Sequence, residues 1–582
     1  MRPPVRATYR LQLRNGVTFA EAAALAPQLA RAGISHVYAS PIFRAVAGST
    51  HGYDVADHTV IDPALGGEAG FFAFSSALKA HGLGLILDIV PNHMAAHSDN
   101  PWWRDVLRHG PSSRYARHFD IDWTAQTLTL PILGKPYGEA LADGDMARAT
   151  HPEWGEGLAV AGQHLPLAPG TEHLSDVHAC HEAQPYRVTH WRLARDGLTY
   201  RRFFEIAGLV GVRVEEPHVF DDVHRLVQTL VEDGHVSGLR VDHVDGLADP
   251  AAYLTRLSTL GVPVWVEKIL GEDEGLPPWP VVGTTGYEFM AALHAAFVDE
   301  AGLAHLSAAY DAIAPAAYGA MEAAAKHRIA TVNLAGEFAS LETMARALFA
   351  SDMSARDHGP DTIRRGLIAL SCALPVYRTY ITGTPSEADR GHVEAARLAA
   401  AIGNLDERRV VDDLAALIVR GGAEEAPFVA RWQQTTGPLM AKAVEDTLFF
   451  RHHRLIALNE VGSHPSAPLR VHNLDKALAS PGLATTQTHD TKRGPDARAR
   501  LYQLTHPDAA RWWDTFWPTV GGGVSPSWQW ALAQMWLGAL PLDHDPTFKA
   551  RFCAAVEKSA REAKEDTSWT RHNLAFESML RA

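Results

Sequence analysis

Cysteine is scarce in this sequence. The 582 residues include 3 cysteines, Cys180, Cys372 and Cys553, which lie far apart along the chain. An odd and sparse set of this kind excludes a disulfide framework and a zinc ribbon. It is typical of a protein from a reducing compartment, and we expect a cytoplasmic location.

Long apolar runs and an excess of positive charge are also missing. The longest apolar candidate, GLGLILDIVP over 82–91, is interrupted by Asp88 and Pro91, so no segment approaches the length that crosses a membrane. The first residues, MRPPVRATYRLQLRNG, contain no apolar core of the signal-peptide kind. The formal net charge is −14, which disfavours nucleic acid and anionic membranes as partners.

Motifs for metals and nucleotide cofactors are absent from the sequence as well. It contains no HExxH, CxxC or GxxxxGK[ST], and GLGLIL over 82–87 lacks the third glycine of a dinucleotide-binding turn. The segment HACHE, 178–182, brings His178, Cys180 and His181 together, but without the spacing of metal ligands. We expect neither a metal nor a cofactor.

Strand and helix patterns alternate in the first 90 residues and return near residue 236. Thr18 and Glu21 form a capping-box signature before an apolar helix. The nearly continuous apolar run over 83–90 predicts a strand that is buried on both faces, as in a parallel sheet. Two further strands are predicted over 236–246 and 262–270. A short helix lies between them, with Asp249 as its N-cap. These repeats predict an α/β fold of the (β/α)8 TIM-barrel type.

Long stretches of different composition interrupt the alternation and divide the chain into five segments. We predict a first part of a catalytic barrel over 1–90, an inserted subdomain after the third strand over 91–230, the barrel continued over 231–290, a helical insertion over 291–480, and a late barrel strand (483–492) with a helical tail over 481–582. The tail carries a cluster of tryptophans between 512 and 536. Their helical spacing favours core packing, while stacking on sugar rings is the alternative.

Polar residues stand at the ends of four predicted strands. The segments are DIVPNH (Asp88, Asn92, His93), GLRVDHVDG (Arg240, Asp242, His243, Asp245), VEKI (Glu267, Lys268) and THDTKR (His489, Asp490, Lys492, Arg493). Because the carboxyl ends of barrel strands converge on one face, we expect these side chains to meet there. For any one of them, a capping or salt-bridge role is the alternative.

The residue types within these segments suit glycoside chemistry. Arg240 and Asp242 are two apart on a strand and point the same way, so the guanidinium would keep Asp242 ionised, as a nucleophile needs. Glu267 follows the apolar run Trp265–Val266, and an apolar setting raises a carboxyl pKa and suits a general acid. One ionised and one protonated carboxyl is the arrangement that glycosidic bond cleavage uses.

The four segments resemble the four signature regions of the α-amylase superfamily (glycoside hydrolase family 13), which uses a retaining mechanism. The resemblance implies that Asp242 is the nucleophile, Glu267 the general acid/base and Asp490 the third carboxylate, which grips sugar hydroxyls. It also implies that Asp88, His93, Arg240 and His489 line the subsite of the reacting sugar. We expect the adjacent Asn92 and His243 to bind substrate with them.

Longer segments narrow the resemblance to one family, the maltooligosyltrehalose synthases. They are SPIFRAVAGSTHGYDVADH (40–58), YRRFFEIAGLVGVRVEEPHVFD (200–221), GLRVDHVDGLADP (238–250), VEKILGEDEGLPPWPVVGTTGYEF (266–289), VEDTLFFRHHRLIALNEVG (444–462), THDTKRGPDARARL (488–501) and REAKEDTSW (561–569). The resemblance runs from about residue 6 to 575 and implies an isomerase, a (1→4)-α-D-glucan 1-α-D-glucosylmutase. Such an enzyme converts the reducing-end α-1,4 linkage of a maltooligosaccharide into an α,α-1,1 linkage.

Isomerisation requires that the released glucose stays in a dry pocket and reacts again. Our candidates for the pocket walls are His51, Tyr53, Asp54, Lys268 and Lys492. The substrate partner is a maltooligosaccharide or α-glucan, and a trehalose-releasing hydrolase is an expected functional partner. Two other functions remain open, an amylase-like α-glucan hydrolase that admits water, and a non-catalytic relative that only binds α-glucan.

The sequence departs from the family pattern at its end. The resemblance places an eighth barrel strand, a DLYQG-like motif and a β-sandwich-like domain after REAKEDTSW, whereas the sequence ends at Ala582. A natural short form, a fragment, and a last strand supplied from elsewhere are the three interpretations. We therefore expect the barrel to be incomplete at its last strand.

Overall fold

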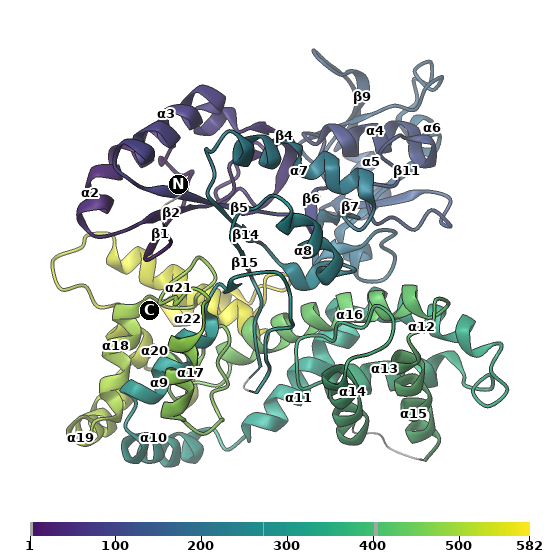
Figure 1. Ribbon diagram of the computed structural model, residues 1–582. Coiled ribbons are helices and arrows are strands. Elements are labelled where there is room, and N and C mark those ends of the chain that lie inside the picture. Colours follow the sequence, from purple (N-terminus) through teal and green to yellow (C-terminus); the bar gives the residue numbers. More distant parts are fainter. Residues whose placement is uncertain (1–3, 272, 401–404, 582) are drawn as a thin grey trace.

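The computed structural model describes residues 4–271, 273–400 and 405–581 (Figure 1). Its centre is a parallel sheet in which β1, β2, β5, β14, β15 and β16 lie side by side in that order. The strands are β1 (Thr8–Leu11), β2 (His36–Ala39), β5 (Gly84–Ile89), β14 (Gly238–Val241), β15 (Val264–Val266) and β16 (Gly283–Thr284). This curled arrangement confirms the prediction of a parallel sheet of the (β/α)-barrel type.

Helices between these strands cover the sheet as the sequence predicts. They are α1 (Phe19–Ala24), α2 (Ala26–Arg31), α3 (Gly67–Ala80), α7 (Pro217–Glu232) and α8 (Pro250–Ser258). The capping box of Thr18 and Glu21 is present at the start of α1. The carboxylate of Asp249 caps α8 by accepting the backbone N–H of Ala252. Both predictions of helix starts are therefore confirmed.

Short sheets and helices fill the stretch between β5 and α7 and the loop after β2. The strands are β3 (Phe43–Ala45), β4 (Val55–Ile61), β6 (His93–Ala95), β7 (Leu128–Leu133), β8 (Met146–His151), β9 (Gly155–Val160), β10 (Gln163–Pro166), β11 (Tyr186–His190), β12 (Arg202–Phe203) and β13 (Ile206–Gly211), and the helices are α4 (Pro101–His109), α5 (Tyr137–Ala142) and α6 (Val177–Glu182). Buried side chains of this part belong to the same apolar cluster as the central sheet.

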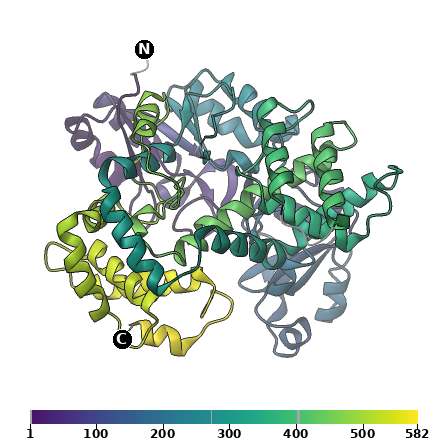
Figure 2. The same ribbon diagram turned by 90° about the horizontal axis from the view of Figure 1, so that it is seen from below.

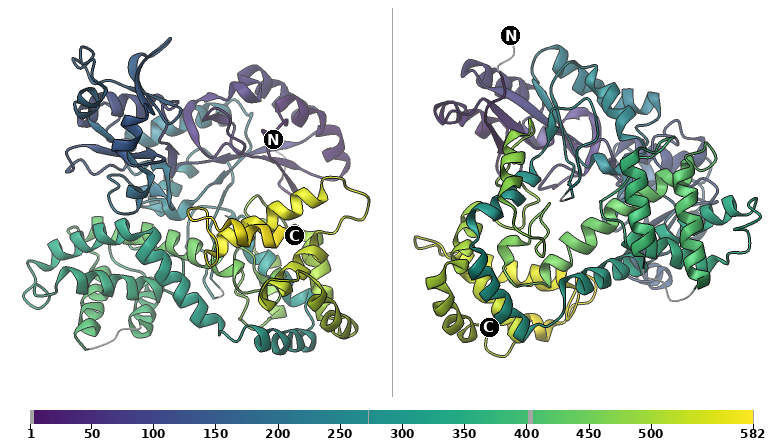
Figure 3. Two further views of the ribbon diagram at one scale, coloured as in Figure 1. Left: turned by 180° about the vertical axis from the view of Figure 1, so that it is seen from behind. Right: turned by 60° about the horizontal axis from the view of Figure 1, so that its bottom comes forward.

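The longer regular elements in the rest of the described chain are helices. The helices are α9 (Tyr287–Phe297), α10 (Glu300–Ile313), α11 (Tyr318–Arg328), α12 (Ala335–Phe349), α13 (Pro360–Cys372), α14 (Glu387–Ala399), α15 (Leu405–Arg420), α16 (Ala426–Met440), α17 (Val471–Ala479), α18 (Pro495–Tyr502), α19 (Pro507–Phe516), α20 (Pro526–Ala539), α21 (Phe548–Ala563) and α22 (Leu574–Arg581). Helices α11 to α16 enclose an apolar core of their own. Figures 2 and 3 show this group, the insertion after β5 and the C-terminal helices as separate regions around the sheet. The five predicted segment boundaries stay a prediction.

Over 483–492 the sequence predicts a late strand that runs into a loop, and in the structure this segment has no strand. The segment is extended, and the Leu483 N–H donates to the Thr284 carbonyl of β16 at 3.0 Å. Beyond that bond, the described residues around it supply no ladder of backbone hydrogen bonds. The segment therefore lies beside β16, where the next barrel strand belongs, but its side-chain contacts rather than a sheet hold its far end.

The sequence also raises the questions of how its tryptophan cluster is used and whether any helix crosses a membrane. Trp513 and Trp530 in the C-terminal helices are fully buried, whereas Trp512 and Trp536 are 45% and 37% exposed, so core packing explains part of the tryptophan cluster. No helix of the described residues is both long enough and apolar enough to span a membrane.

Candidate active site

Arg240 on β14 lies at the centre of the candidate site. Its buried guanidinium donates through Nη1 to Asp88 Oδ1 at 2.9 Å and to Asp242 Oδ1 at 2.7 Å. Its Nη2 lies 3.2 Å from Glu267 Oε2. The register of the sheet explains this meeting, because Arg240 pairs with Asp88 on β5 and with Trp265 on β15. β15 ends at Val266, so Glu267 follows the strand directly, as the sequence predicts.

Burial in this cluster changes the acidity of the two central carboxyl groups. Burial raises the pKa of Glu267 and of Asp242, and the proximity of other carboxylates raises both further, while Arg240 opposes the rise. Two acids this close favour a state with one shared proton. Arg240 makes its short bond to Asp242, and its second nitrogen lies farther from Glu267, at 3.2 Å. The two carboxyl groups thus share one guanidinium, and the pKa of both is raised.

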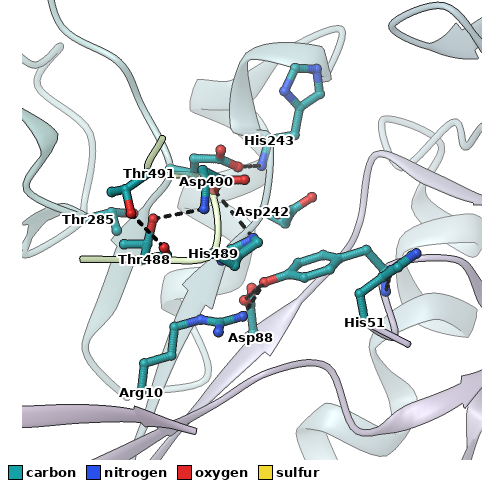
Figure 4. A network of polar contacts seen from close by, with 12 residues as sticks. Arg10, His51, Asp88, Asp242, His243, Thr285, Thr488, His489, Asp490 and Thr491 are labelled. Atoms are coloured by element: carbon teal, nitrogen blue, oxygen red, sulfur yellow. Dashed lines mark hydrogen bonds and ion pairs between the residues drawn. The ribbon is translucent and has the colours of Figure 1, made fainter. Parts of the chain in front are cut away.

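Asp490 reaches the cluster from the 483–493 segment (Figure 4). Its Oδ2 accepts the hydroxyl of Tyr287 at 2.9 Å and lies 3.3 Å from Nε2 of His489. Burial opposes ionisation, but the neighbouring His489, Arg240 and the Tyr287 hydroxyl hold the pKa of Asp490 below its usual value. Asp490 therefore stays charged beside Glu267.

Tyr53 and His489 form an aromatic wall next to the carboxylates. Their rings stack with centroids 4.8 Å apart. The Tyr53 hydroxyl donates to Asp88 Oδ2 at 2.6 Å and accepts from Arg10 Nη2 at 3.0 Å. Burial lowers the pKa of His489 to about 4, so its imidazole is neutral at pH 7. The aromatic wall beside the carboxylates therefore carries no charge.

The other predicted residues of the strand ends surround this group. His93 is buried and stacks on Phe203 at 4.2 Å, and burial lowers its pKa well below the usual value. Asn92 Oδ1 accepts Arg201 Nη1 at 2.8 Å. His243 has a left-handed backbone (φ 45°), which aims its N–H at Glu267 Oε2 at 2.7 Å. Figure 4 shows the His243 imidazole turned away from Asp242.

A cavity with about 680 Å³ of space, partly open to solvent, lies against Glu267 and Asp490. Its lining residues are Phe204, His243, Asp245, Glu267, Ile269, Tyr377, Gly437, Ala441, Glu445, Asp446, Val461, Asp490 and Lys492. The 680 Å³ includes space that is open to solvent. The cavity joins the ends of the central strands to the helical part of the chain.

The predicted wall residues have different positions. Lys492 lines the cavity and donates to Asp446 Oδ1 at 2.9 Å. Lys268 is fully buried behind the wall, where its ammonium contacts Glu274 Oε1 at 2.9 Å and donates to the Ile269 carbonyl at 2.7 Å. Of the predicted wall residues, the cavity lining thus includes Lys492, whereas Lys268, His51, Tyr53 and Asp54 are absent from it. His51 and Asp54 face each other at 3.7 Å beside Tyr53, with His51 half exposed.

Sequence reasoning did not single out Glu445, Asp446 or Tyr377. A π-helical turn over Ala441–Glu445 follows α16 and brings this stretch to the cavity, a feature that is common at functional sites. Glu445 accepts the Tyr377 hydroxyl, and Lys442 and Lys492 flank Asp446 at 2.8 and 2.9 Å. The segment that begins VEDT is one of those that resemble the family, and this resemblance is the signal that could have found them.

The part of the chain that the structure describes contains no candidate metal site. No group of three or more His, Cys, Asp or Glu side chains there is arranged to hold an ion. The carboxylates instead have Arg240, tyrosine hydroxyls and backbone N–H groups as partners. The arrangement supports acid–base and nucleophilic chemistry that its own side chains supply.

Comparisons with known proteins agree with this site. The profile of the α-amylase catalytic domain matches residues 27–255. A protein of Mycobacterium tuberculosis that bears the name maltooligosyl trehalose synthase is 37% identical over 605 residues, which cover 99% of this chain and 75% of that protein. Intracellular maltogenic amylase of Bacillus subtilis is 39% identical over 89 residues, which cover 15% of this chain and 14% of the amylase.

Solved structures match over the whole chain. Maltooligosyltrehalose synthase from Arthrobacter ramosus has a TM-score of 0.88 and 36% identity, and the match covers 99% of this chain and 74% of that one. A maltooligosyl trehalose synthase structure from Sulfolobus tokodaii has a TM-score of 0.83 and 28% identity, and covers 100% and 76%. The chain therefore belongs to the maltooligosyltrehalose synthase family, within the α-amylase superfamily.

Proposed function

We propose that the cluster around Arg240 carries out intramolecular transglycosylation on maltooligosaccharides by a retaining double displacement. The supporting observation is that one buried guanidinium contacts Asp242 at 2.7 Å and Glu267 at 3.2 Å, with both carboxyls raised in pKa. Asp242 is the nucleophile, Glu267 the general acid and then base, and Asp490 binds sugar hydroxyls. The product keeps the chain length of the substrate and ends in an α,α-1,1 linkage.

In the first half of the reaction, a carboxylate oxygen of Asp242 attacks the anomeric carbon of the penultimate sugar. The bond from that carbon to O4 of the terminal glucose breaks, and Glu267 donates its proton to O4. A covalent glycosyl ester on Asp242 and free glucose result. The hydrogen bonds that sugar hydroxyls donate to the Asp490 carboxylate would strengthen as the anomeric carbon gains positive charge.

In the second half, the released glucose must turn within the cavity. Its anomeric hydroxyl loses a proton to Glu267 and attacks the ester carbon, and Asp242 leaves as a carboxylate. We propose that the far wall, with Lys492, Asp446 and Glu445, holds the glucose by hydrogen bonds during this turn. Phe204 and Val461, which also line the cavity, would reduce the access of water, which competes as the acceptor.

The cellular context follows from the chemistry of the product. A maltooligosaccharide that ends in trehalose has lost its reducing end, so a trehalose-releasing hydrolase is the class of enzyme that would consume it. We propose this pairing, and we also propose a cytoplasmic location. Support for the location is that Cys180, Cys372 and Cys553 are all free thiols, as expected of a reducing compartment.

The test is an assay with maltohexaose that follows reducing ends and free glucose together. The isomerase consumes reducing ends and releases little glucose. An amylase-like hydrolase generates reducing ends instead, and a non-catalytic binder changes neither. Production of reducing ends by the wild type would therefore overturn the proposal.

The nucleophile assignment is tested with Asp242→Asn. We expect this variant to lose activity by roughly 10⁴-fold or more, as removal of a catalytic nucleophile or its partner does. Maltohexaose should still raise its melting temperature, since the cavity remains. The matched control is Asp249→Asn, which keeps a capping side chain at the start of α8 and should keep full activity. Activity retained in Asp242→Asn would contradict the assignment.

A further inference from the structure

The carboxylate of Glu460 is fully buried and lies outside the cavity lining. It belongs to the stretch that follows a short 3₁₀ turn over Ile456–Leu458. A buried carboxylate is costly unless charges and hydrogen bonds compensate it. The partners of Glu460 therefore indicate why this residue stands there.

Glu460 contacts the loop that carries the third carboxylate. Its Oε2 accepts the backbone N–H of Lys492 at 2.8 Å, and its Oε1 accepts the backbone N–H of Arg493 at 2.6 Å. Arg498 in α18 supplies the compensating charge through Nη1, 3.2 Å from Glu460 Oε1. The same Nη1 donates to the Arg493 carbonyl at 2.7 Å. One carboxylate and one guanidinium thus hold three successive peptide units.

This loop needs such support because it is not part of a sheet ladder or a helix. Residues 483–493 have neither assignment, and Leu483 is joined to β16 by a single backbone bond at 3.0 Å. At the other end, α18 begins at Pro495. Asp490 lies between these two points, two residues before the first N–H that Glu460 accepts. The Glu460 carboxylate and Arg498 therefore fix the backbone on the downstream side of Asp490.

We propose that Glu460, together with Arg498, is a positioning residue that sets the placement of Asp490 and Lys492 in the active site. Glu460 touches neither the cavity nor the other carboxylates, and it acts through the backbone of the loop. Lys492 is held at both ends, by Glu460 at its N–H and by Asp446 at its ammonium. The proposal rests on the proposed function for what Asp490 and Lys492 do.

The test variant is Glu460→Gln, in which the amide nitrogen replaces one of the two acceptors. One of the two N–H groups then faces a donor, and Arg498 loses its counter-charge. We expect the loop to shift and kcat on maltohexaose to fall by roughly 10- to 100-fold, because misplacement by about 1 Å costs this much. KM should change by less than about threefold, since the hydroxyl contacts matter most in the transition state. The glucose released per turnover should rise as Lys492 loses its place.

The matched control is Glu577→Gln. Glu577 is also a buried carboxylate, and Arg561 contacts it through Nε at 3.0 Å and Nη2 at 2.8 Å, but it lies on α22 away from the cavity. This variant should lose stability in the same way and keep kcat and the product ratio. Arg498→Lys is the second variant, which keeps the charge, and its kcat should fall less than that of Glu460→Gln.

Hydrogen exchange on the peptide 486–497 gives a readout that does not depend on activity. In Glu460→Gln the N–H groups of Lys492 and Arg493 should exchange faster than in the wild type, whereas Glu577→Gln should leave them protected. Unchanged exchange, unchanged kcat in a folded Glu460→Gln, or an equal loss of kcat in Glu577→Gln would each overturn the proposal. If the wild type lacks isomerase activity, the proposed function fails, and the exchange result still decides whether Glu460 holds the loop.

Discussion

Glu445 is an acid whose surroundings make it sensitive to pH near neutrality. It lies in the cavity wall, accepts the Tyr377 hydroxyl and faces Lys492 and Asp446. Burial raises its pKa from an ordinary value to about 7, while Lys492 opposes the rise and Asp446 and Asp490 add to it. The side chain is therefore close to half protonated at neutral pH.

The raised pKa of Glu445 has a consequence for stability. The folded state keeps the proton up to about pH 7, whereas an unfolded glutamic acid loses it near pH 4.3. The folded protein therefore binds more protons between these values, and stability from this residue falls as pH rises through that window. Allowing for its partial exposure, we expect an effect on the order of 2 kcal/mol. Melting curves of the wild type and Glu445→Gln at pH 5 and pH 8 measure it.

The test compares how much stability the wild type and Glu445→Gln each lose between pH 5 and pH 8. From pH 5 to pH 8 the wild type should lose more stability than Glu445→Gln, since glutamine does not titrate. The control variant is Glu288→Gln. Burial also raises the pKa of Glu288, but this residue lies on α9 outside the cavity lining. If wild type and Glu445→Gln respond identically to pH, the raised pKa of Glu445 is refuted.

The residue scale also shows what the sequence could and could not predict. Arg240, Asp242 and Glu267 were predictable because strand ends of a parallel sheet share one edge. Glu445 and Glu460 were not, because each comes to the site through helix and loop packing that has no periodic pattern. Lys268 was predicted as a wall residue, but its ammonium is buried against Glu274 and the Ile269 carbonyl, and the residue is absent from the cavity lining.

At the scale of elements, the contact between the turn after β16 and the 483–493 segment is close. Gly286 has φ +94°, and a Cβ on it would lie 1.8 Å from the Leu483 carbonyl oxygen. Only glycine permits both this backbone conformation and this approach. The turn thus acts as the surface on which the segment with Asp490 rests.

Gly286→Ala should therefore damage both stability and activity. The added methyl group must push the segment away from β16, and we expect a loss of at least about 2 kcal/mol in the free energy of unfolding. The rate on maltohexaose should fall by more than stability alone explains, because Asp490 moves with the segment. Urea unfolding and initial rates at a temperature where the variant is folded measure the two effects.

Gly234→Ala is the control for backbone strain alone. Gly234 has φ +70°, and a Cβ added to it would have no other atom within 4 Å, so alanine there should cost about 1 kcal/mol and leave the rate unchanged. A Gly286→Ala variant that behaves like Gly234→Ala would show that the segment does not depend on this contact. Gly286 stands within the GTTGYEF segment that resembles the family, but its structural role depends on a neighbour that comes about 200 residues later in the chain.

Elements with local causes were the ones that the sequence predicted well. Thr18 and Asp249 fix helix starts through bonds to residues two or three positions away, and the predicted caps are present. The segment over 483–492 has the composition of a strand, but a strand also requires partners, and pairing is a property of distant parts of the chain. Tertiary context decided this element.

At the scale of the molecule, charged contacts join the insertion after β5 to the helical part beyond the cavity. Asp120 in the insertion accepts Arg201 Nε at 2.8 Å and Arg431 Nη2 of α16 at 2.7 Å. Burial opposes its charge, but Arg431 and Arg201 hold the pKa of Asp120 well below its usual value. This stabilising contribution is present above about pH 4 and is lost only as pH falls through the low folded pKa. Arg201 also donates to Asn92. This bond connects the Arg201–Asp120–Arg431 contact, which we call the clamp, to the active site.

Asp120→Asn should loosen the two parts of the molecule that face each other across the site. We expect a loss of about 1–2 kcal/mol in unfolding free energy, less than for a fully buried pair because Arg431 is partly exposed. Since water exclusion requires both parts to close on the sugar, a larger share of turnovers on maltohexaose should end as free glucose. Asp412→Asn removes the Arg397 contact at 2.6 Å within the helical part alone and should leave the product ratio unchanged. Equal glucose release from Asp120→Asn and the wild type would mean that this clamp does not govern access of water, and that exclusion depends on the cavity wall alone.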